Sequence, residues 1–478
     1  MKKIVFILSI TVLIHSHAGA QSKSINWEKF QYSGPGLKQT GWLVTRSSNE
    51  IKSSAWSVGC ETLDRDYAKF SVYKKYVGEL GVKRGRLQSG WAKCEKEKGK
   101  YNFAWLDSCV YGLAEIGVQP WVCLCYGNPV YGSEILLGSK IFNDEKSMAA
   151  WCKYVEATVS RYKNVVTEWE VWNEPSRTQF KEYANLLIRT AETIRKVQPD
   201  AVILGFSLSN VGAGNLDFAK DVFEILKSNN KLELIDNLTY HPYSRNPDDS
   251  YPGVQKLKSL VDSYNPGIKL FQGEVGCPSI LEFGHALNQY PWTEISQVKW
   301  IMRRMAGDRV RDIPSSVFTI IDLKYPNMLQ SFGLIRSNLL NEFVYKRPSF
   351  YGVQHMAGFF DDMVKPLGEL EYISNAYRKM TVAGFKKQEA PVVLIWYNDR
   401  IPDDNLAWDL VDITIKETNF KDPVYVEMIS GKVFEIDKSN LSNDGNSTKI
   451  KNLPVWDSVI MIAERAQVNV KSNINEVK

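Results

Sequence analysis

The chain has 478 residues, of which 44% are hydrophobic and 24% are charged. This balance is typical of a globular protein and excludes a disordered or fibrous chain. Lys and Arg total 59 against 54 Asp and Glu, a formal net charge of +5, so the sequence shows no strongly basic character that would indicate a nucleic-acid partner.

The first twenty residues are predicted to form a signal peptide. Lys2 and Lys3 precede an apolar run over residues 4–14, and Ala18-Gly19-Ala20 supplies a cleavage site after it. That run is too short for a permanent transmembrane helix, and no later stretch reaches about 18 uninterrupted apolar residues. The sequence therefore predicts a soluble, exported protein, periplasmic or secreted, with no transmembrane segment.

Short apolar runs alternate with helical patterns over residues 54–367, whereas residues 21–53 precede this series and could add a strand to a later sheet. Eight strands that alternate with helices over about 310 residues favour the α/β class, as a (β/α)8 TIM barrel. A doubly wound sheet is the competing architecture, but no Gly-rich phosphate loop follows the first strand. The predicted strands are Ala55–Gly59, Val82–Gln88, Gln119–Cys125, Val166–Trp172, Ala201–Phe206, Asn237–Tyr240, Lys269–Gly273 and Ser316–Ile321.

The pattern changes after residue 367, where short and often alternating segments follow one another without helices. Ser430-Gly431 fits a hairpin turn between two of them. We predict that residues 368–478 form a C-terminal antiparallel β-sandwich. Its predicted strands are Pro391–Trp396, Trp408–Ile415, Val424–Met428, Lys432–Ile436 and Ser458–Ala463.

Cysteine and histidine are too sparse for a disulfide scaffold or a metal cluster. An odd number of cysteines leaves at least one thiol unpaired, and one or two bridges are open. No cluster of Cys, His and carboxylates at short spacing predicts a metal site, and we expect no cofactor. The seven cysteines are Cys60, Cys94, Cys109, Cys123, Cys125, Cys152 and Cys277.

Two glutamates end predicted barrel strands, where active-site residues of this fold lie. Glu174 follows the fourth strand and Glu274 the seventh, 100 residues later, which equals three βα repeats of roughly 33 residues each. Two carboxylates that face each other across a barrel mouth suit cleavage of a glycosidic bond. One protonates the leaving oxygen while the other attacks or stabilises the anomeric carbon.

The run Trp172-Asn173-Glu174-Pro175 resembles the strand-four signature of the clan A retaining glycoside hydrolases. The resemblance implies that Glu174 is the acid/base and Glu274 the nucleophile of a double displacement. It also implies that Arg86, near the end of the second strand, orients the nucleophile. His241-Pro242-Tyr243 follows the sixth strand, where clan members commonly place a His and a Tyr against the nucleophile or substrate. The likeness covers residues 54–363, and the trailing sandwich is similar to families 39, 5 and 30.

Further residues are predicted to bind substrate because they follow strands at the same rim, and rings among them could stack on a pyranose face. Clan members often place a Trp after the eighth strand, whereas this chain has the run Thr319–Lys324 there. The family and the sugar are therefore open. The predicted substrate-binding residues are Arg86, Asn173, His241, Tyr243, Tyr126, Asn128, Trp292 and Asp322.

Together these features predict a glycoside hydrolase that cleaves a β-type bond in a poly- or oligosaccharide. A catalytically silent carbohydrate-binding barrel and a transglycosylase are the alternatives. Retention predicts that the carboxyl carbons of Glu174 and Glu274 lie about 5–5.5 Å apart. Glu170 shares the inward face of its strand, and we predict for it a structural role, paired with a base inside the barrel. The oligomeric state is open.

Overall fold

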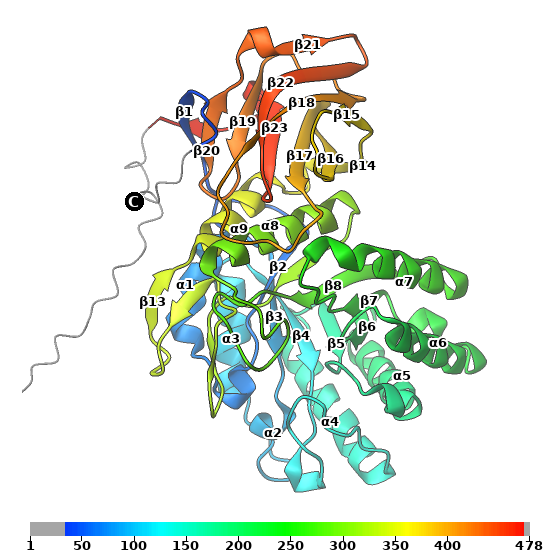
Figure 1. Ribbon diagram of the computed structural model, residues 1–478. Helices are drawn as coiled ribbons and strands as arrows, with labels where there is room; N and C mark the ends of the chain where they lie inside the picture. The colour runs from blue at the N-terminus through cyan, green and yellow to red at the C-terminus, as the bar shows by residue number, and fades with distance from the viewer. Residues whose placement is uncertain (1–33, 473–478) are drawn as a thin grey trace, which may run out of the picture.

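The computed structural model describes residues 34–472, so the predicted signal peptide lies outside the described residues. Figure 1 shows a helix-ringed barrel with antiparallel sheets stacked on one side of it. Within the described range, no helix combines the length and apolar character that crossing a bilayer requires.

The barrel closes from eight parallel strands in chain order, as predicted. The eighth strand is shorter than predicted, because the chain leaves the barrel after Val317 and Ile320 donates its N–H to the carbonyl of Gly59 instead. The strands are β2 (Trp56–Gly59), β3 (Arg84–Gln88), β4 (Gln119–Leu124), β5 (Glu168–Val171), β6 (Val202–Leu208), β7 (Asn237–Tyr240), β8 (Lys269–Val275) and β9 (Ser315–Val317).

Amphipathic helices cover the barrel. Tyr183, Leu187, Ala191 and Ile194, spaced three or four residues apart, all lie in the core, as one stripe of a helix should. The helices are α1 (Phe70–Leu80), α2 (Trp91–Cys94), α3 (Ala104–Glu115), α4 (Glu145–Tyr162), α5 (Phe180–Val197), α6 (Ala213–Ser228), α7 (Tyr251–Tyr264), α8 (Glu294–Val310) and α9 (Pro348–Phe359). Two short hairpins follow the barrel strands, β10 (Leu323–Lys324) with β11 (Leu329–Gln330), and β12 (Ile335–Ser337) with β13 (Phe343–Lys346).

Two antiparallel sheets form the C-terminal part of the fold. The hydroxyl of Tyr425, in the larger sheet, donates to the carbonyl of Pro454 in the smaller one. The larger sheet has the order β14 (Val364–Glu369), β16 (Met380–Lys387), β17 (Ala390–Tyr397), β23 (Ile460–Glu464), β19 (Pro423–Glu427), β20 (Lys432–Glu435), β1 (Gln39–Leu43) and β24 (Val470–Lys471). The smaller sheet has the order β15 (Tyr372–Ser374), β18 (Asp409–Lys416), β22 (Ser447–Val455) and β21 (Leu441–Asn443).

Strand β1 joins the larger sheet from the other end of the sequence. It pairs with β20 and β24, and Thr40 donates its hydroxyl to the carbonyl of Val433, 393 residues away. The N-terminal segment therefore contributes a strand to the C-terminal sheet. At the other boundary, the sheet starts at Val364 in β14, four residues before the predicted position 368.

Helices α8 and α9 lie between the barrel and the sheets (Figure 1). Every residue of α8 from Ser296 to Val310 is buried, including several charged ones. Lys299 pairs with Asp457 of the C-terminal part at 2.6 Å, and Arg303 pairs with Asp248 at 2.6 Å and donates to the carbonyl of Arg400. Buried charges of this kind are tolerated because each has a partner.

All seven cysteines are free thiols, and all except Cys152 are buried. The one or two disulfide bridges that the sequence left open are therefore not formed.

Candidate active site

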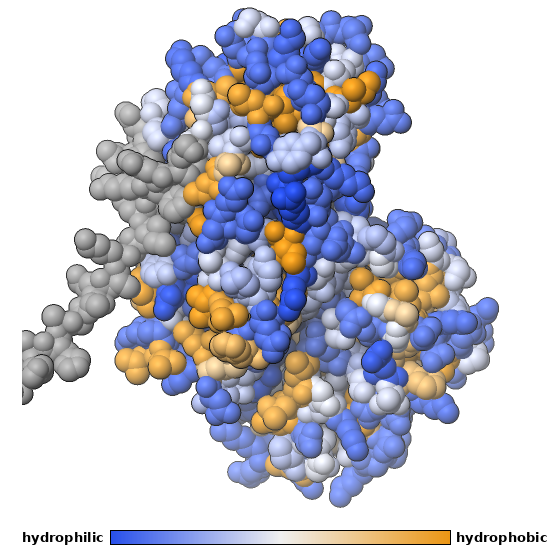
Figure 2. All heavy atoms as spheres, in the orientation of Figure 1, coloured by the Kyte–Doolittle hydropathy of each residue, from blue (hydrophilic) through white to orange (hydrophobic). Residues whose placement is uncertain are grey.

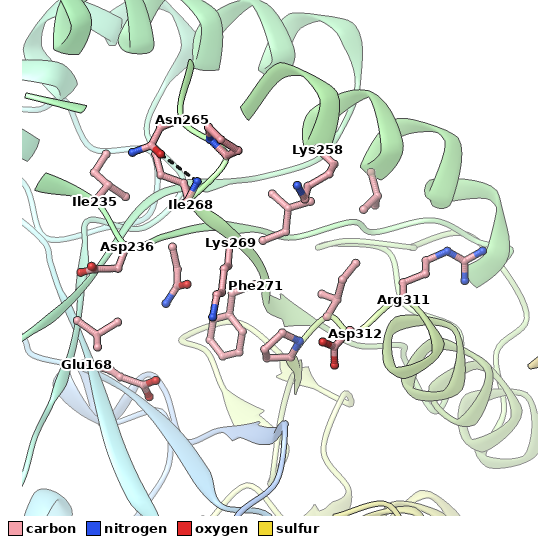
Figure 3. Close-up of a pocket in the computed structure, with 18 of the residues that line it drawn as sticks. Glu168, Ile235, Asp236, Lys258, Asn265, Ile268, Lys269, Phe271, Arg311 and Asp312 are labelled. Atoms are coloured by element: carbon pink, nitrogen blue, oxygen red, sulfur yellow. Dashed lines mark hydrogen bonds between the residues drawn. The ribbon is translucent and has the colours of Figure 1, made fainter. Parts of the chain in front are cut away.

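The barrel has hollows at both ends, and only one end carries the predicted catalytic glutamates. A hollow of about 950 Å³ lies at the amino end, and its wall includes Glu168, Asp236 and Lys269 (Figure 3). These residues lie at or just before the first residues of β5, β7 and β8. Glu174 and Glu274 lie at the opposite, carboxyl end, which is where this fold places its chemistry.

The chain makes a strained turn where β5 reaches the carboxyl rim. Trp172 has φ 67° and Glu174 has φ 48°, both in the left-handed region that residues other than glycine rarely adopt. Hydrogen bonds to the flanking strands hold the turn, from Trp172 N to Leu124 O at 3.0 Å and from Glu174 N to Ser207 O at 3.1 Å. Strain fixed in this way is found at functional sites, where it aims a side chain.

Glu174 is held by His241, which follows β7. His241 Nδ1 lies 2.7 Å from Glu174 Oε1, and its Nε2 lies 3.2 Å from the hydroxyl of Ser207. Burial lowers the pKa of His241, but the charge of Glu274 and the hydrogen bond to Glu174 outweigh it, so the pKa is raised. Glu174 and His241 are therefore in position to share a proton.

Glu274 is held by a different set of donors. Arg86 Nη1 donates to its Oε2 at 2.6 Å, and the hydroxyl of Tyr243 donates to its Oε1 at 2.9 Å. Burial raises the pKa of Glu274, yet His241, Arg86 and Tyr243 together bring it below its ordinary value. These partners therefore favour the ionised form of Glu274.

Arg86 is the centre of this network, and its side chain is fully buried. Its Nε donates to Glu170 at 2.8 Å, and Nη1 donates to Glu61 at 2.8 Å as well as to Glu274. Nη2 donates to Asn173 Oδ1 at 2.7 Å. The structural role predicted for Glu170 is confirmed, because it is buried against Arg86 and also accepts from Thr239 at 2.6 Å.

Glu174 and Glu274 face each other across the barrel mouth. One carboxylate oxygen of each and a ring nitrogen of His241 lie within 4.8 Å of one another. The two glutamate side chains are 18% and 12% exposed, so a substrate can reach them while His241 stays buried. Among the described residues, this is the one such group close enough to hold a metal ion, but its members already bond to one another or to the Arg86 cation, which an incoming metal would have to displace.

A second hollow, of about 250 Å³, opens beside Tyr126 at the same rim. Tyr126 accepts a hydrogen bond from Asn173 Nδ2 at 2.8 Å, which links the rim to Arg86. Arg65 stacks over the Tyr126 ring at 5.5 Å and lines the hollow together with Trp91 and Ile135. Of the residues predicted to bind substrate, the structure thus brings Arg86, Asn173, His241, Tyr243 and Tyr126 into one network with the two glutamates.

Three other predicted substrate-binding residues bond elsewhere, and within residues 34–472 none of them has a hydrogen bond or ion pair to Glu174 or Glu274. Asn128 accepts from Val130 N and donates to Glu95 O. Trp292 is buried and donates its indole N–H to Leu287 O at 2.7 Å. Asp322 is buried in a two-bond pair with Arg347.

Glu61, Ser207 and Tyr325 belong to the site but were not predicted from the sequence. Glu61 comes two residues after β2, so the rule that rim residues follow strand ends could have found it. Ser207 faces His241 because β6 bulges between Gly205 and Leu208, and a bulge re-aims a side chain in a way no sequence pattern announces. The ring of Tyr325 lies 4.5 Å from that of His285 and is tilted by 47° to it, and the charge of Glu274 adds to the burial that raises the pKa of Tyr325.

Comparison with known proteins agrees with this geometry. Residues 86–254 match the model of the glycosyl hydrolases family 39, a stretch that includes Arg86, Glu174 and His241. No curated protein matches the chain in sequence.

Solved structures share the fold at low sequence identity. A family 39 glycoside hydrolase from Bacteroides cellulosilyticus WH2 has a TM-score of 0.62 and 17% identity, covering 86% of this chain and 81% of its own. A monomeric beta-xylosidase from Caulobacter crescentus CB15 has a TM-score of 0.56 and 14% identity, and the match covers 89% of this chain and 97% of the xylosidase chain. A family 30 subfamily 8 xylanase from Clostridium acetobutylicum has a TM-score of 0.52 and 12% identity, and the match covers 89% of this chain and 98% of the xylanase chain. The barrel, the trailing sheets and the family match together identify this chain as a glycoside hydrolase that resembles clan A.

Proposed function

We propose that the protein is a retaining glycoside hydrolase that acts by double displacement, with Glu274 as nucleophile and Glu174 as acid/base. The observation that carries the proposal is that a carboxylate oxygen of Glu174 and one of Glu274 lie within 4.8 Å of each other. The two carboxyls have different partners, because His241 holds Glu174 whereas Arg86 and Tyr243 hold Glu274. Retaining enzymes keep their two carboxyl groups about 5–5.5 Å apart, whereas inverting enzymes need about 6.5–9.5 Å to admit a water.

In the first step Glu274 Oε attacks the anomeric carbon while Glu174 gives its proton to the departing oxygen. A bond forms between carbon and Glu274 as the bond to the leaving group breaks. Arg86 and Tyr243 hold the Glu274 carboxylate in line, and His241 holds Glu174. In the second step Glu174 takes a proton from water, and the water oxygen bonds to the anomeric carbon on the face that the leaving group left. The bond between that carbon and Glu274 breaks on the opposite face, which returns Glu274 as a carboxylate.

For the substrate we propose a β-glycoside in a poly- or oligosaccharide. Two structures of similar fold are named as a beta-xylosidase and a xylanase, which makes aryl β-xylosides the first probes to use. Asn173, Tyr126 and Arg65 would line the sugar subsite at the rim. Turnover of an aryl glycoside separates this proposal from a silent carbohydrate-binding barrel, and product analysis with an added sugar acceptor separates it from a transglycosylase.

Azide rescue tests the two roles. A dinitrophenolate leaves without a proton, so Glu174→Ala should form the glycosyl-enzyme at a near-normal rate with a dinitrophenyl glycoside while losing activity on natural linkages. Azide should then speed the second step and give a glycosyl azide of retained configuration. Glu274→Ala should be inactive on both substrates, and azide should give at most the inverted product, because no covalent intermediate can form.

Glu168→Gln is the matched control, since this glutamate lies at the amino end of the same strand as the Glu174 turn and pairs with Arg84. It should keep wild-type turnover on both substrates. If azide gave the retained product with Glu274→Ala and the inverted one with Glu174→Ala, the roles would be exchanged. Unchanged turnover in both variants would place the active site elsewhere.

We also propose that the protein is exported, on the pattern of residues 1–20. N-terminal sequencing of the protein recovered from an exporting cell should begin at Gln21. A chain that still begins at Met1 would contradict the proposal.

A further inference from the structure

Glu61 is a buried carboxylate that accepts a hydrogen bond from Arg86. Its Oε1 accepts from Arg86 Nη1 at 2.8 Å, and its side chain is 1% exposed. Within residues 34–472, its Oε2 has no hydrogen-bond partner. The carboxyl folds back over the end of its own strand, where a Cβ on Gly59 would come within 2.3 Å of Oε2, so Gly59 provides the space for it. An unpartnered oxygen this deeply buried costs more on an ionised carboxylate than on a neutral acid, because an unpaired charge is harder to bury than an unpaired dipole.

The charges around Arg86 do not balance if every carboxyl is ionised. One guanidinium faces three carboxyls, the buried ones of Glu61 and Glu170 and the partly exposed one of Glu274. Glu170 has a second donor in Thr239 and Glu274 has one in Tyr243, whereas among the residues that the structure describes Glu61 has no side-chain donor besides Arg86. Glu61 is therefore the member of the three whose anion is least stabilised, and the one that most readily holds a proton.

The surroundings of Glu61 point the same way. Burial raises its pKa to about 7, and the charge of Glu274 adds to this effect while Arg86 and His241 oppose it. The other titratable groups that face it have pKa values raised by burial, and they are neutral near pH 7. These groups are Cys60 beside it, Tyr73 of α1, Tyr243 after β7 and Tyr325 after β10.

We propose that Glu61 is a positioning residue that acts through Arg86 on the nucleophile. As a neutral acid it accepts one Nη1 hydrogen and fixes the guanidinium, which leaves the other Nη1 hydrogen to Glu274. As a carboxylate it competes with Glu274 for the same nitrogen and loosens the Arg86–Glu274 bond. This inference rests on the proposed function, since it takes Glu274 as the nucleophile.

The pH dependence of kcat/KM on a dinitrophenyl glycoside isolates this effect, because that leaving group needs no proton from Glu174. For the wild type we expect a fall of about fivefold between pH 6 and pH 8.5, as Glu61 ionises. Glu61→Gln keeps the acceptor oxygen and cannot ionise, so its profile should stay flat at the wild-type pH 6 value. Glu61→Ala removes the acceptor and should lower kcat about tenfold or more at every pH, with KM little changed.

Glu282→Gln is the matched control. Glu282 is another buried carboxyl whose pKa is raised to about 7 by burial, and its Oε2 also has no hydrogen-bond partner within residues 34–472. Its Oε1 accepts from the backbone N–H of Ser331, however, and it does not contact Arg86. Its variant should keep the wild-type fall with pH.

Two results would overturn the proposal. A flat wild-type profile would show that no ionisation of this kind reaches the nucleophile. A fall that persists in Glu61→Gln would belong to another group of the site, with His241, whose pKa is raised above its ordinary value by Glu274 and Glu174, as the first to test. If Glu61→Gln does not fold, Glu61→Asp keeps a titrating group with a shorter reach, and an unaltered profile in that variant would count against the proposal. Failure of the proposed function looks different, because Glu274→Ala would then remain active.

Discussion

At the scale of single residues, Arg86 combines two tasks that a lysine could not combine. Its planar fork sends hydrogens in three directions, to Glu170, to Asn173, and to Glu61 and Glu274 together. A lysine ammonium is a compact point charge with three donors. The same side chain therefore pairs with carboxyls inside the barrel and, in the proposed mechanism, orients Glu274.

Arg86→Lys should lower kcat by about a hundredfold or more on any substrate, because the carboxylate of Glu274 loses its alignment. It should also lower the free energy of unfolding by about 3 kcal/mol, since at least one buried carboxylate is left without its donor. Steady-state kinetics and urea denaturation measure the two effects. Arg84→Lys is the control on the same strand, because Arg84 pairs with Glu168 at the far end of the barrel, and a comparable loss of kcat there would contradict this account.

Sequence reasoning reached residues whose signals are local. Glu174 lies in a distinctive tripeptide and Glu274 directly after a recognisable apolar run, so both could be located by strand order alone. Glu61 belongs to no sequence motif, and its proposed role depends on residues far from it in the chain. Arg86 lies 25 residues after Glu61, and Glu274 lies 188 residues after Arg86. Trp292 and Asp322 look available in the sequence, but tertiary partners, Leu287 O and Arg347, engage them. Only the folded loops could show that.

At the scale of elements, helix α9 contacts the turn between β19 and β20 through His355. The imidazole is buried, and its Nδ1 donates to the carbonyls of Met428 and Ile429 at 3.1 and 3.2 Å. A Cβ on Gly431, which has φ 68°, would come within 2.5 Å of the ring, so glycine serves both the turn and the contact. The predicted Ser430-Gly431 hairpin is thus a docking point for a barrel helix as well as a turn.

This histidine should make the fold sensitive to acid. Burial lowers the pKa of His355 to about 4 from an ordinary 6.5, so the unfolded chain binds a proton more tightly than the folded one between these values. Its contribution is complete above pH 6.5 and is lost as the pH falls toward 4, by about 3 kcal/mol at most. His355→Asn keeps a donor but cannot titrate. The difference between the wild-type and variant unfolding free energies should fall with decreasing pH across this window and stay constant from pH 7 to 9; a constant difference throughout would refute the expectation.

At the scale of the whole molecule, the barrel and the C-terminal sheets meet across buried charges on α8. Lys299 pairs with Asp457 and also donates to the carbonyls of Asp403 and Asn405. Because these partners all lie beyond residue 400, an α8 without the C-terminal sheets would hold an uncompensated ammonium. The two parts should therefore unfold together.

Asp457→Ala should lower the free energy of unfolding by about 3–5 kcal/mol, since it removes one partner of a buried pair. Replacing both partners, Lys299→Met with Asp457→Leu, should restore part of that loss. The exposed pair Lys258–Asp262 on α7 is the control, and Asp262→Ala should cost about 0.5 kcal/mol or less. Urea denaturation followed by circular dichroism measures all three, and a separate early transition for the C-terminal sheets would contradict the expected coupling.

The position of β1 has a consequence for the order in which the chain assembles. β1 is synthesised before every barrel strand, yet its two partners, β20 and β24, are among the last segments to be made. Until both partners have been made, β1 has two unpaired edges, and open strand edges recruit other chains. Once the barrel has folded, the gap left to close is far shorter than the 393 residues that separate Thr40 from Val433. Loss of the final strand β24 would leave β1 as a permanent edge, and chains shortened before Val470 should therefore aggregate while their barrels remain intact.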